Sequence, residues 1–213
     1  MWLDSSGRAL ADYPHPSIAV DVALLTVVDD RQAVLLHEKD DGPWSLPGTF
    51  VRIDERLRDA ALRALRDKAG VAGQEPEQLR VFDGLDRDSR GRVMSVAHVD
   101  LVPARTLETR TASLVPVDEL PELAFDHREI VEAAVEWARA EYRERPDPRG
   151  LAGQEFTLLE LQRVHEAVLG TSLQKDTFRR RMIDQLRETP EVSRGSVGKP
   201  ARLFRKHTAN QPN

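Results

Sequence analysis

Apolar residues in the first two thirds of the chain occur in short runs that predict a sheet. Residues 18–28 are almost continuously apolar, which is typical of a buried strand. Residues 33–37 follow after a short polar turn, so these two segments predict a hairpin. Further extended segments are predicted at residues 44–51, 79–82, 93–102 and 112–117.

Two other segments of this region repeat apolar residues at helical spacing. Leu57 and Ala60 begin the apolar face of a helix predicted over residues 56–69, and Gly70 fits the position that ends such a helix. A second helix is predicted over residues 126–142. Strands mixed with helices in this order indicate the α/β class.

The last quarter of the chain has a different pattern. Thr157 and Glu160 form a capping box at the start of a predicted helix that Gly170 ends. A second helix is predicted over residues 175–187. Its inner stripe, with apolar residues four apart, is Phe178, Met182 and Leu186.

Two extended runs, at residues 192–197 and 198–205, then predict a β-hairpin that forms a wing. A helix, a short turn and a second helix with a basic exposed side form the helix-turn-helix pattern, whose second helix enters the major groove of double-stranded DNA. The candidate DNA-contacting residues are Lys175, Thr177, Arg179, Arg180, Arg181, Arg194, Lys199 and Arg202. The alternative is a charged, solvated helix followed by a basic tail.

Charge divides the chain at the same place. The net charge is −5, but residues 1–149 hold 20 Lys and Arg against 29 Asp and Glu, whereas residues 150–213 hold 11 against 7. An acidic body with a basic end predicts two modules with different partners. We therefore predict a ligand-sensing and dimerisation domain at residues 1–145, a linker at residues 146–154 that is rich in proline, glycine and charge, and a DNA-binding domain at residues 155–208.

Composition excludes several classes of protein. The chain has no cysteine, so it can form neither disulfides nor thiolate metal sites. It has no run of 18 apolar residues and no basic-then-apolar leader. These features predict a cytoplasmic protein with no membrane partner.

A chemical motif lies at residues 49–71, which resemble the Nudix box G-x5-E-x7-R-E-U-x-E-E-x-G-U, where U is a bulky aliphatic residue. The positions that match are Glu55, Arg63, Leu65, Gly70 and Val71, with Thr49 in the place of the first glycine. In the box, three glutamates share one helix face and hold Mg²⁺ or Mn²⁺. In this chain those three positions are occupied by Ala64, Asp67 and Lys68. An ammonium group repels a divalent ion, so we predict a non-enzyme with no catalytic residue, metal or cofactor.

Basic and aromatic residues around this box are candidates for binding a nucleotide diphosphate. The candidate ligand-binding residues are Arg52, Arg63, Arg66, Lys68, Arg90 and Arg92 for the phosphates and Phe50 and Trp44 for an adenine ring. Lys68 can contact a phosphate directly as a point charge. Two alternatives stay open, since Arg63 can pair with Asp59 or Asp67 and both aromatic residues can belong to the core.

Several runs spread along the chain resemble the Nudix-related transcriptional regulators of the NrtR family. They are residues 13–17, 46–51, 89–96, 123–127, 156–162 and 178–181. The resemblance implies an N-terminal Nudix-like α/β/α sandwich with a mixed sheet, followed by a C-terminal winged helix-turn-helix domain. It further implies a homodimeric repressor of NAD metabolism genes that binds a palindromic DNA operator and releases it when ADP-ribose, the small nucleotide effector, binds.

This sequence departs from the family pattern at two places. Thr49 stands where a glycine is usual, and Asp88-Ser89-Arg90 stands where Asp-Pro-Arg is usual. Two other functions stay open. One is an active Nudix hydrolase of ADP-ribose-type substrates that uses Glu55, Asp67 and carboxylates outside the box, with the C-terminal part only stabilising a dimer. The other is a DNA-binding protein that binds no ligand and whose Nudix domain serves only to dimerise.

Overall fold

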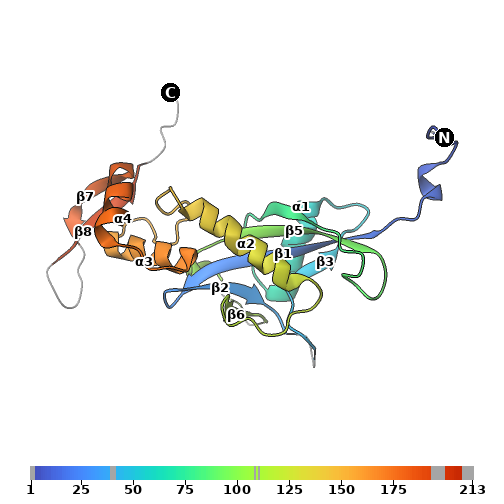
Figure 1. Cartoon of the computed structure of the whole chain (residues 1–213), viewed down its shortest axis with the longest axis horizontal. Helices are drawn as coiled ribbons and strands as arrows, with labels where there is room; N and C mark the ends of the chain where they lie inside the picture. Colours follow the sequence, from blue (N-terminus) through green and yellow to red (C-terminus); the bar gives the residue numbers. More distant parts are fainter. Residues whose placement is uncertain (1–2, 39–41, 108, 110, 193–199, 208–213) are drawn as a thin grey trace.

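The computed structural model describes residues 3–38, 42–107, 109, 111–192 and 200–207. Its larger part is a mixed sheet in the order β4-β5-β1-β2-β6, with β3 paired to β1 (Figure 1). The strands are β1 (Ser17–Val28), β2 (Arg31–Leu36), β3 (Gly48–Phe50), β4 (Glu77–Phe82), β5 (Val93–Leu101) and β6 (Ser113–Pro116). Because β1 and β5 run parallel and the other pairs antiparallel, the predicted mixed sheet and the hairpin of β1 and β2 are confirmed.

Helices cover both faces of this sheet, as the alternation of side chains along β1 requires. On one face, Val20 and Leu24 pack against α1 (Leu57–Ala64). On the other face, Ala23 and Leu25 pack against α2 (His127–Tyr142). The predicted α/β/α sandwich is therefore confirmed (Figure 1).

The helix predicted over residues 56–69 consists of two elements. α1 ends at Ala64 and continues into a π-helical turn, Leu65–Ala69. Gly70, at φ +65°, ends this turn, and the N–H of Val71 donates to the carbonyl of Leu65. Such a terminus needs a left-handed residue, which only glycine adopts without steric cost, so the predicted role of Gly70 is confirmed.

The C-terminal part is a winged helix with a core of its own. Its elements are α3 (Leu158–Leu169), α4 (Lys175–Met182), a 3-10 turn (Ile183–Gln185) and the antiparallel strands β7 (Leu186–Val192) and β8 (Arg202–Lys206). The buried residues between them are Phe156, Leu161, Phe178, Met182, Leu186 and Phe204. The predicted capping box is present, because the Glu160 N–H donates to Thr157 Oγ1 at 3.1 Å and the Thr157 N–H to Glu160 Oε2 at 2.7 Å.

Two predicted boundaries in this part are wrong. The helix predicted to reach residue 187 ends at Met182, and the strand predicted to begin at residue 192 begins at Leu186. Leu186 is extended, at φ −119° and ψ 142°, because it pairs with Lys206 and buries its side chain in the winged-helix core. Such contacts come from far along the chain, so the spacing of apolar residues alone could not reveal them. Residues 193–199, which include much of the predicted hairpin, lie outside the described residues.

The segment predicted as a linker, residues 146–154, lies between α2 and α3 and is held by a buried carboxylate. Asp147 is fully buried, and its Oδ1 accepts hydrogen bonds from the Tyr142 hydroxyl at 2.8 Å and the Leu151 N–H at 2.7 Å. α3 also contributes Val168 to the apolar cluster of α2 and the sheet. The winged helix is therefore packed against the sandwich rather than merely tethered to it.

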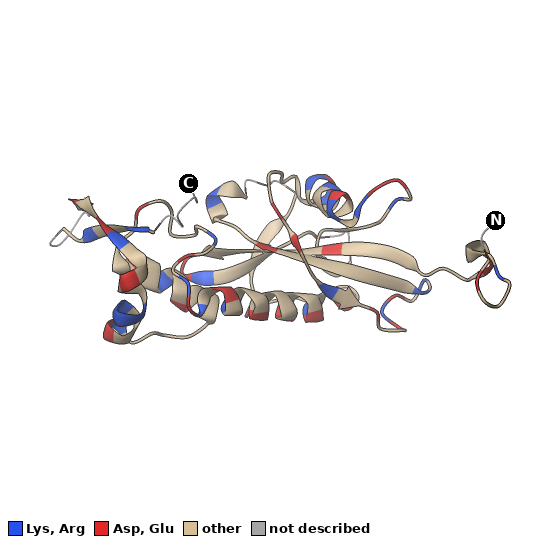
Figure 2. Cartoon of the chain, turned by 90° about the horizontal axis from the view of Figure 1, so that it is seen from above, with Lys and Arg blue, Asp and Glu red and all other residues tan. Residues whose placement is uncertain are grey.

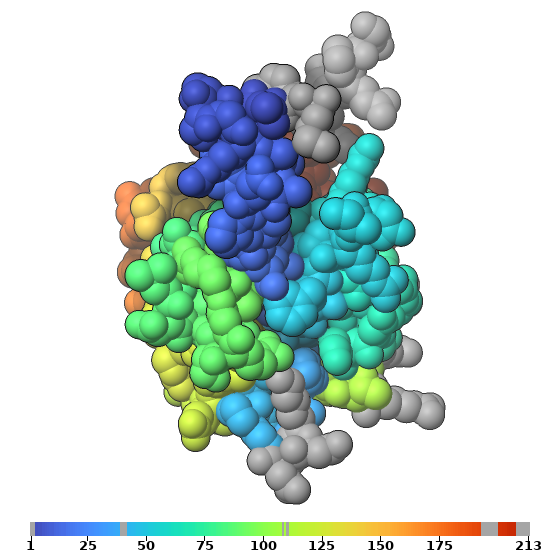
Figure 3. All heavy atoms as spheres, turned by 90° about the vertical axis from the view of Figure 1, so that its right-hand side faces the viewer, coloured from blue at the N-terminus to red at the C-terminus, as the bar shows by residue number. Residues whose placement is uncertain are grey.

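Residues 3–16 extend from the end of the sheet that is opposite the winged helix and contain a short 3-10 turn, Leu10–Asp12 (Figure 1). In Figure 3 the green loop before β5 and the cyan segment after β3 flank this N-terminal stretch. A further 3-10 turn is Ala104–Thr106. Within the described ranges, no helix is both long and apolar enough to cross a membrane.

Candidate functional site

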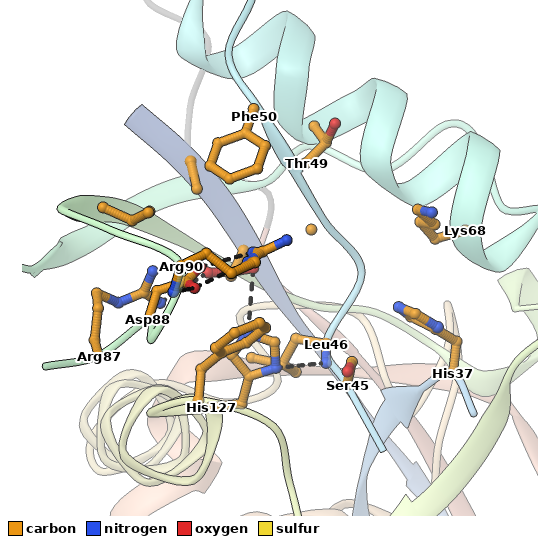
Figure 4. Close-up of a pocket in the computed structure, with 15 residues that line it drawn as sticks. His37, Ser45, Leu46, Thr49, Phe50, Lys68, Arg87, Asp88, Arg90 and His127 are labelled. Atoms are coloured by element: carbon orange, nitrogen blue, oxygen red, sulfur yellow. Dashed lines mark hydrogen bonds and ion pairs between the residues drawn. The ribbon is translucent and has the colours of Figure 1, made fainter. Parts of the chain in front are cut away.

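A cavity of about 270 Å³ opens beside the start of α2 (Figure 4). β1, the segment leading into β3, the π-helical turn, the loop before β5 and the first residue of α2 all contribute to its walls. The residues that line it are Ala19, Asp21, His37, Ser45, Leu46, Gly48, Thr49, Phe50, Lys68, Arg87, Asp88, Arg90, Val93, Phe125 and His127.

A buried carboxylate lies at the floor of this cavity. Asp21, on β1, is 6% exposed, and its Oδ2 accepts a hydrogen bond from Ser95 Oγ at 2.6 Å. The same oxygen lies 3.3 Å from the Arg87 guanidinium. Burial alone would raise the pKa of Asp21, but the contacts with His127, Ser95 and Arg87 outweigh it and hold the pKa below its usual value. These contacts favour the charged form of Asp21, which faces Arg87, Ser95 and His127.

His127, the first residue of α2, is held by a hydrogen bond at Nδ1 and lies beside Asp21. Its Nδ1 accepts a hydrogen bond from the Leu46 N–H at 3.0 Å, so in the neutral ring the proton is on Nε2. Nε2 lies 3.3 Å from Asp21 Oδ1. The residue before it, Asp126, accepts two hydrogen bonds from Arg87, at 2.6 and 2.9 Å. The cavity floor and the first turn of α2 therefore form one network of charges and hydrogen bonds.

A glycine is required at position 48, because the side chain of Asp21 lies close against its backbone. Gly48 lies opposite Asp21 in the pairing of β1 and β3. A Cβ atom at this position would lie 2.0 Å from Asp21 Oδ1 and 3.0 Å from the carbonyl oxygen of Val20. Any side chain here would therefore displace the buried carboxylate.

Two phenyl rings and a guanidinium form the mouth of the cavity. Phe50 and Phe125 are 45% and 44% exposed, and Arg90 lies 5.7 and 5.6 Å from their ring centres. Arg90 also donates two hydrogen bonds to Asp88, whose side chain is 2% exposed, and this pairing lowers the pKa of Asp88 to about 2. Phe125 has φ +54°, which is costly for a residue other than glycine and is typical of functional sites.

Of the residues predicted to bind a ligand, Phe50, Lys68 and Arg90 line the cavity. In Figure 4, Lys68 lies across the cavity from Arg90. Two of the others are engaged elsewhere, since Arg66 pairs with Asp67 at the surface and Arg92 donates to backbone carbonyls of the loop before β5. Trp44 packs against the core beneath α2 and Arg52 is exposed, and neither lines the cavity.

Arg63 holds the loop that follows β3. Its guanidinium pairs with Glu55 and donates to Thr49 Oγ1 and to the carbonyl of Phe50, both at 2.9 Å. The pairing lowers the pKa of Glu55 to about 2. The partner of Arg63 is therefore Glu55 rather than Asp59 or Asp67, and Arg63 positions Phe50 at the cavity mouth.

The residues present do not fit a magnesium site. Ala64 is buried and has no ligating atom, Asp67 pairs with a neighbouring arginine, and Glu55 is bound to Arg63. Across the described part of the chain, no group of three or more His, Cys, Asp or Glu residues is arranged to hold a metal ion.

Sequence reasoning missed most of the cavity. The missed residues include Asp21, His37, Ser45, Arg87, Asp88, Phe125 and His127. One signal was present, since Asp21 is a single carboxylate inside a long apolar strand, and a buried charge needs partners. Nothing in the sequence indicated that those partners lie more than 60 residues away.

Basic residues also gather at the winged-helix end of the molecule (Figure 2). On α4, Lys175, Thr177, Arg179 and Arg180 are exposed. Arg181 is exposed as well, but it donates to the carbonyl of Arg143 at 3.4 Å. The other candidate residues belong to the segment predicted as the wing. Arg202 pairs with Glu188 at 2.9 Å, whereas Arg194 and Lys199 lie outside the described residues.

Comparisons with known proteins agree with both halves of this architecture. The NUDIX domain model matches residues 17–134, and the model of the NrtR DNA-binding winged helix domain matches residues 149–205. The ADPR responsive transcriptional repressor NtrR of Acinetobacter baylyi is 31% identical over 92% of this chain and 84% of its own length.

Two solved structures extend the comparison. NrtR of Shewanella oneidensis, in complex with a 27mer DNA, is 32% identical with a TM-score of 0.73, over 89% of this chain and 93% of that chain. The NUDIX domain of the same protein, in complex with ADP ribose, is 29% identical with a TM-score of 0.54, over 62% of this chain and 94% of that chain. From the two matched domains and the relative that spans them, this chain belongs to the NrtR family, in which a Nudix domain is joined to a DNA-binding winged helix.

Proposed function

We propose that this chain is a transcriptional repressor of NAD metabolism genes that releases DNA when ADP-ribose binds its Nudix domain. The observation that carries the proposal is the cavity whose walls hold two exposed phenyl rings, two arginines and a lysine, in a chain that also carries a basic winged helix. The Acinetobacter baylyi relative is an ADPR responsive repressor, which supports the same assignment. As a DNA-bound repressor, the protein would act in the cytoplasm.

In the proposed complex, the ligand lies between the two cationic sides of the cavity. Arg90 and Lys68 face each other across it and suit the two charges of a diphosphate. Phe50 and Phe125 provide flat surfaces on which an adenine ring can pack. Arg63 contributes indirectly, because it fixes the loop that presents Phe50.

We further propose that the ligand is held without being cleaved. Hydrolysis in a Nudix box depends on carboxylates that bind a divalent cation, and here the cavity receives the ammonium group of Lys68 instead. Incubation of the full chain with ADP-ribose and Mn²⁺ should produce no AMP. Turnover at ordinary enzyme rates would instead support the hydrolase alternative.

For DNA we propose a homodimer whose two α4 helices enter successive major grooves of a palindromic operator, roughly one helical turn apart. Lys175, Thr177, Arg179 and Arg180 are the contacts that α4 offers, because their side chains are exposed. Arg194, Lys199 and Arg202, in the segment predicted as the wing, would add contacts to the phosphate backbone, which depend on salt but carry little sequence information. Arg181 is the weakest candidate, since it is hydrogen-bonded toward α2.

A gel shift on duplexes from the upstream regions of NAD-biosynthesis genes tests the proposal. Arg179→Ala should weaken binding by roughly 10-fold to 100-fold, as expected when one arginine contact is lost. Arg58→Ala is the matched control, since Arg58 is an exposed arginine of α1, on the sandwich. Addition of ADP-ribose should release the DNA. Failure to release it at millimolar ADP-ribose would refute the effector role, and equal binding by both variants would refute the role of α4.

A further inference from the structure

α2 is the element that connects the cavity to the winged helix. It has 16 residues, so it is about 24 Å long. Its first residue, His127, belongs to the cavity floor, and its last residue, Tyr142, is fully buried next to the winged helix. The inner face of α2 packs along its length in a close-packed core, so the helix behaves as a rigid element. A shift at one end is therefore passed to the other end.

The cavity end of α2 is placed to respond to a ligand. Arg87 joins Asp126 to Asp21, and His127 is held by Leu46 and Asp21. The ring of Phe125 lies edge-on to His127, at 5.4 Å between centres. An anion that attracts Arg87 or Arg90, or an adenine ring that displaces the Phe125 ring, would therefore act directly on the first turn of α2.

At the far end, three aromatic rings from three helices lie in contact. The ring of Tyr142, on α2, lies 5.1 Å from that of His165, on α3, and both rings meet edge to face. His165 in turn lies 5.0 Å from Phe178, on α4, in the same type of contact. His165 is 1% exposed. This ring stack, Tyr142–His165–Phe178, leads from the sandwich to the helix that carries the exposed arginines.

Other contacts keep this junction from acting as a free hinge. α3 contributes Val168 to the core cluster that contains Tyr142. Arg181 donates to the carbonyl of Arg143, and Gln185 Nε2 donates to the carbonyl of Glu144 at 3.0 Å. The end of α2 therefore cannot move without moving α3 and α4, and tightly packed junctions of this kind change between discrete arrangements rather than bending continuously.

From these contacts we propose that the ring stack Tyr142–His165–Phe178 couples the occupancy of the cavity to the position of α4. The proposal rests on the proposed function, since it concerns how the effector releases DNA. His165 is the central positioning residue of the stack. It acts as a packed neutral ring at pH 7, because burial lowers the pKa of His165 to about 4.

The test measures the coupling between two ligands rather than either affinity. For the full-length protein, the Kd for an operator duplex is determined without and with saturating ADP-ribose, and the ratio of the two values is the coupling factor. By linkage, the Kd for ADP-ribose must change by the same factor when DNA is bound, which gives an independent readout. In the wild-type protein we expect a factor of about 5 to 150.

His165→Leu, which replaces the ring with an apolar side chain of similar size, should bring the coupling factor down toward one. The two separate affinities, for DNA without ADP-ribose and for ADP-ribose without DNA, should each stay within about threefold of wild type, because His165 touches neither ligand in the proposed function. Phe178→Leu should reduce the factor in the same way from the α4 side. The matched control is Leu161→Ala, one turn earlier on α3, which opens a void in the same winged-helix core but removes none of the three rings.

The outcomes separate the two levels of the proposal. If ADP-ribose does not alter DNA binding by the wild-type protein, the proposed function is wrong. If ADP-ribose releases DNA from wild type and from both stack variants with the same factor, the coupling role of the stack is wrong and the proposed function stands. A factor that falls equally in Leu161→Ala also overturns the role of the stack, because general loosening of the winged helix would then explain the loss.

Discussion

Replacement of Asp147 by alanine should destabilise the protein by about 4 kcal/mol, although the residue lies in a segment whose composition predicts a linker. Its carboxylate accepts three hydrogen bonds, from the Tyr142 hydroxyl at 2.8 Å and from the N–H groups of Leu151 and Ala152 at 2.7 and 3.1 Å. Asp147 is fully buried, so no water is available to replace the carboxylate. The backbone adds to the cost, because Asp147 has φ +46°, which alanine adopts with strain.

The estimate follows from the groups left without a partner. Each buried donor that loses a charged acceptor costs roughly 1.5–3 kcal/mol, and the three donors share one carboxylate, so the costs do not add fully. Two variants calibrate the value. Asp147→Asn keeps one acceptor oxygen and tolerates positive φ, so about 2 kcal/mol should be lost. Tyr142→Phe removes a single donor, so about 1 kcal/mol should be lost.

Urea denaturation at pH 7, followed by the fluorescence of Trp44 and Trp137, gives the free energy of unfolding of each variant. The order of stability should be wild type, Tyr142→Phe, Asp147→Asn and then Asp147→Ala. A loss below about 1 kcal/mol for Asp147→Ala would refute the reasoning, since the segment would then behave as an exposed connection with replaceable hydrogen bonds.

Three further predictions follow from the cavity and the ring stack. Gly48→Ala should lower both stability and ADP-ribose affinity, because its Cβ would lie 2.0 Å from Asp21 Oδ1. The control is Gly84→Ala, where the nearest atom to an added Cβ is 3.8 Å away. Denaturation measures the stability of each variant, and calorimetry measures its affinity for ADP-ribose. Arg63→Lys should weaken ADP-ribose binding, as measured by calorimetry, since an ammonium group cannot reproduce the fork that joins Glu55, Thr49 and the Phe50 carbonyl; wild-type affinity would contradict this role. Burial lowers the pKa of His165 from 6.5 to about 4, so the unfolded chain binds the proton more readily than the folded one. The free energy of unfolding should therefore fall by up to about 3 kcal/mol as the pH drops from about 6.5 to 4. Denaturation curves of His165→Leu recorded across that pH range should lack this component.

The sequence predicts those parts of the fold that local rules control. The apolar run of β1, the capping box of Thr157 and Glu160, and the glycine that ends the π-helical turn each act within a few residues, so each can be read from the neighbouring sequence. The charge difference between the two ends also anticipates the basic winged helix.

The predictions that depended on distant contacts were less complete. α4 ends at Met182, and after a short turn Leu186 begins a strand because it pairs with Lys206, 20 residues further along the chain. Residues 146–154 have the composition of a linker, yet Asp147 is held by hydrogen bonds from the Tyr142 hydroxyl and the Leu151 N–H. In both cases hydrogen bonds and burial formed only in the folded chain outweigh the local preference.

The candidate site shows the same limit more strongly. The box motif drew attention to the arginines of α1 and its π-helical turn, but Arg66 lies at the surface and Arg63 is occupied by Glu55. The floor of the cavity instead joins Asp21 to Arg87 and His127, both of which lie far from Asp21 along the chain. Only the parallel pairing of β1 and β5 and the return of α2 bring them together.

The surviving and altered positions of the Nudix box differ in what they contact. Glu55, Arg63 and Thr49 hydrogen-bond to one another and fix the loop that carries Phe50 to the cavity mouth. Ala64, Asp67 and Lys68, which replace the metal-binding glutamates, take no part in that network. Arg63 and its partners thus maintain the shape of a binding loop, whereas Ala64 and Lys68 bring no carboxylate to two of the positions whose glutamates hold a divalent cation in the box. In the proposed sensor this division has a purpose, because a ligand that is held without being hydrolysed would report its own concentration to the DNA-binding helix.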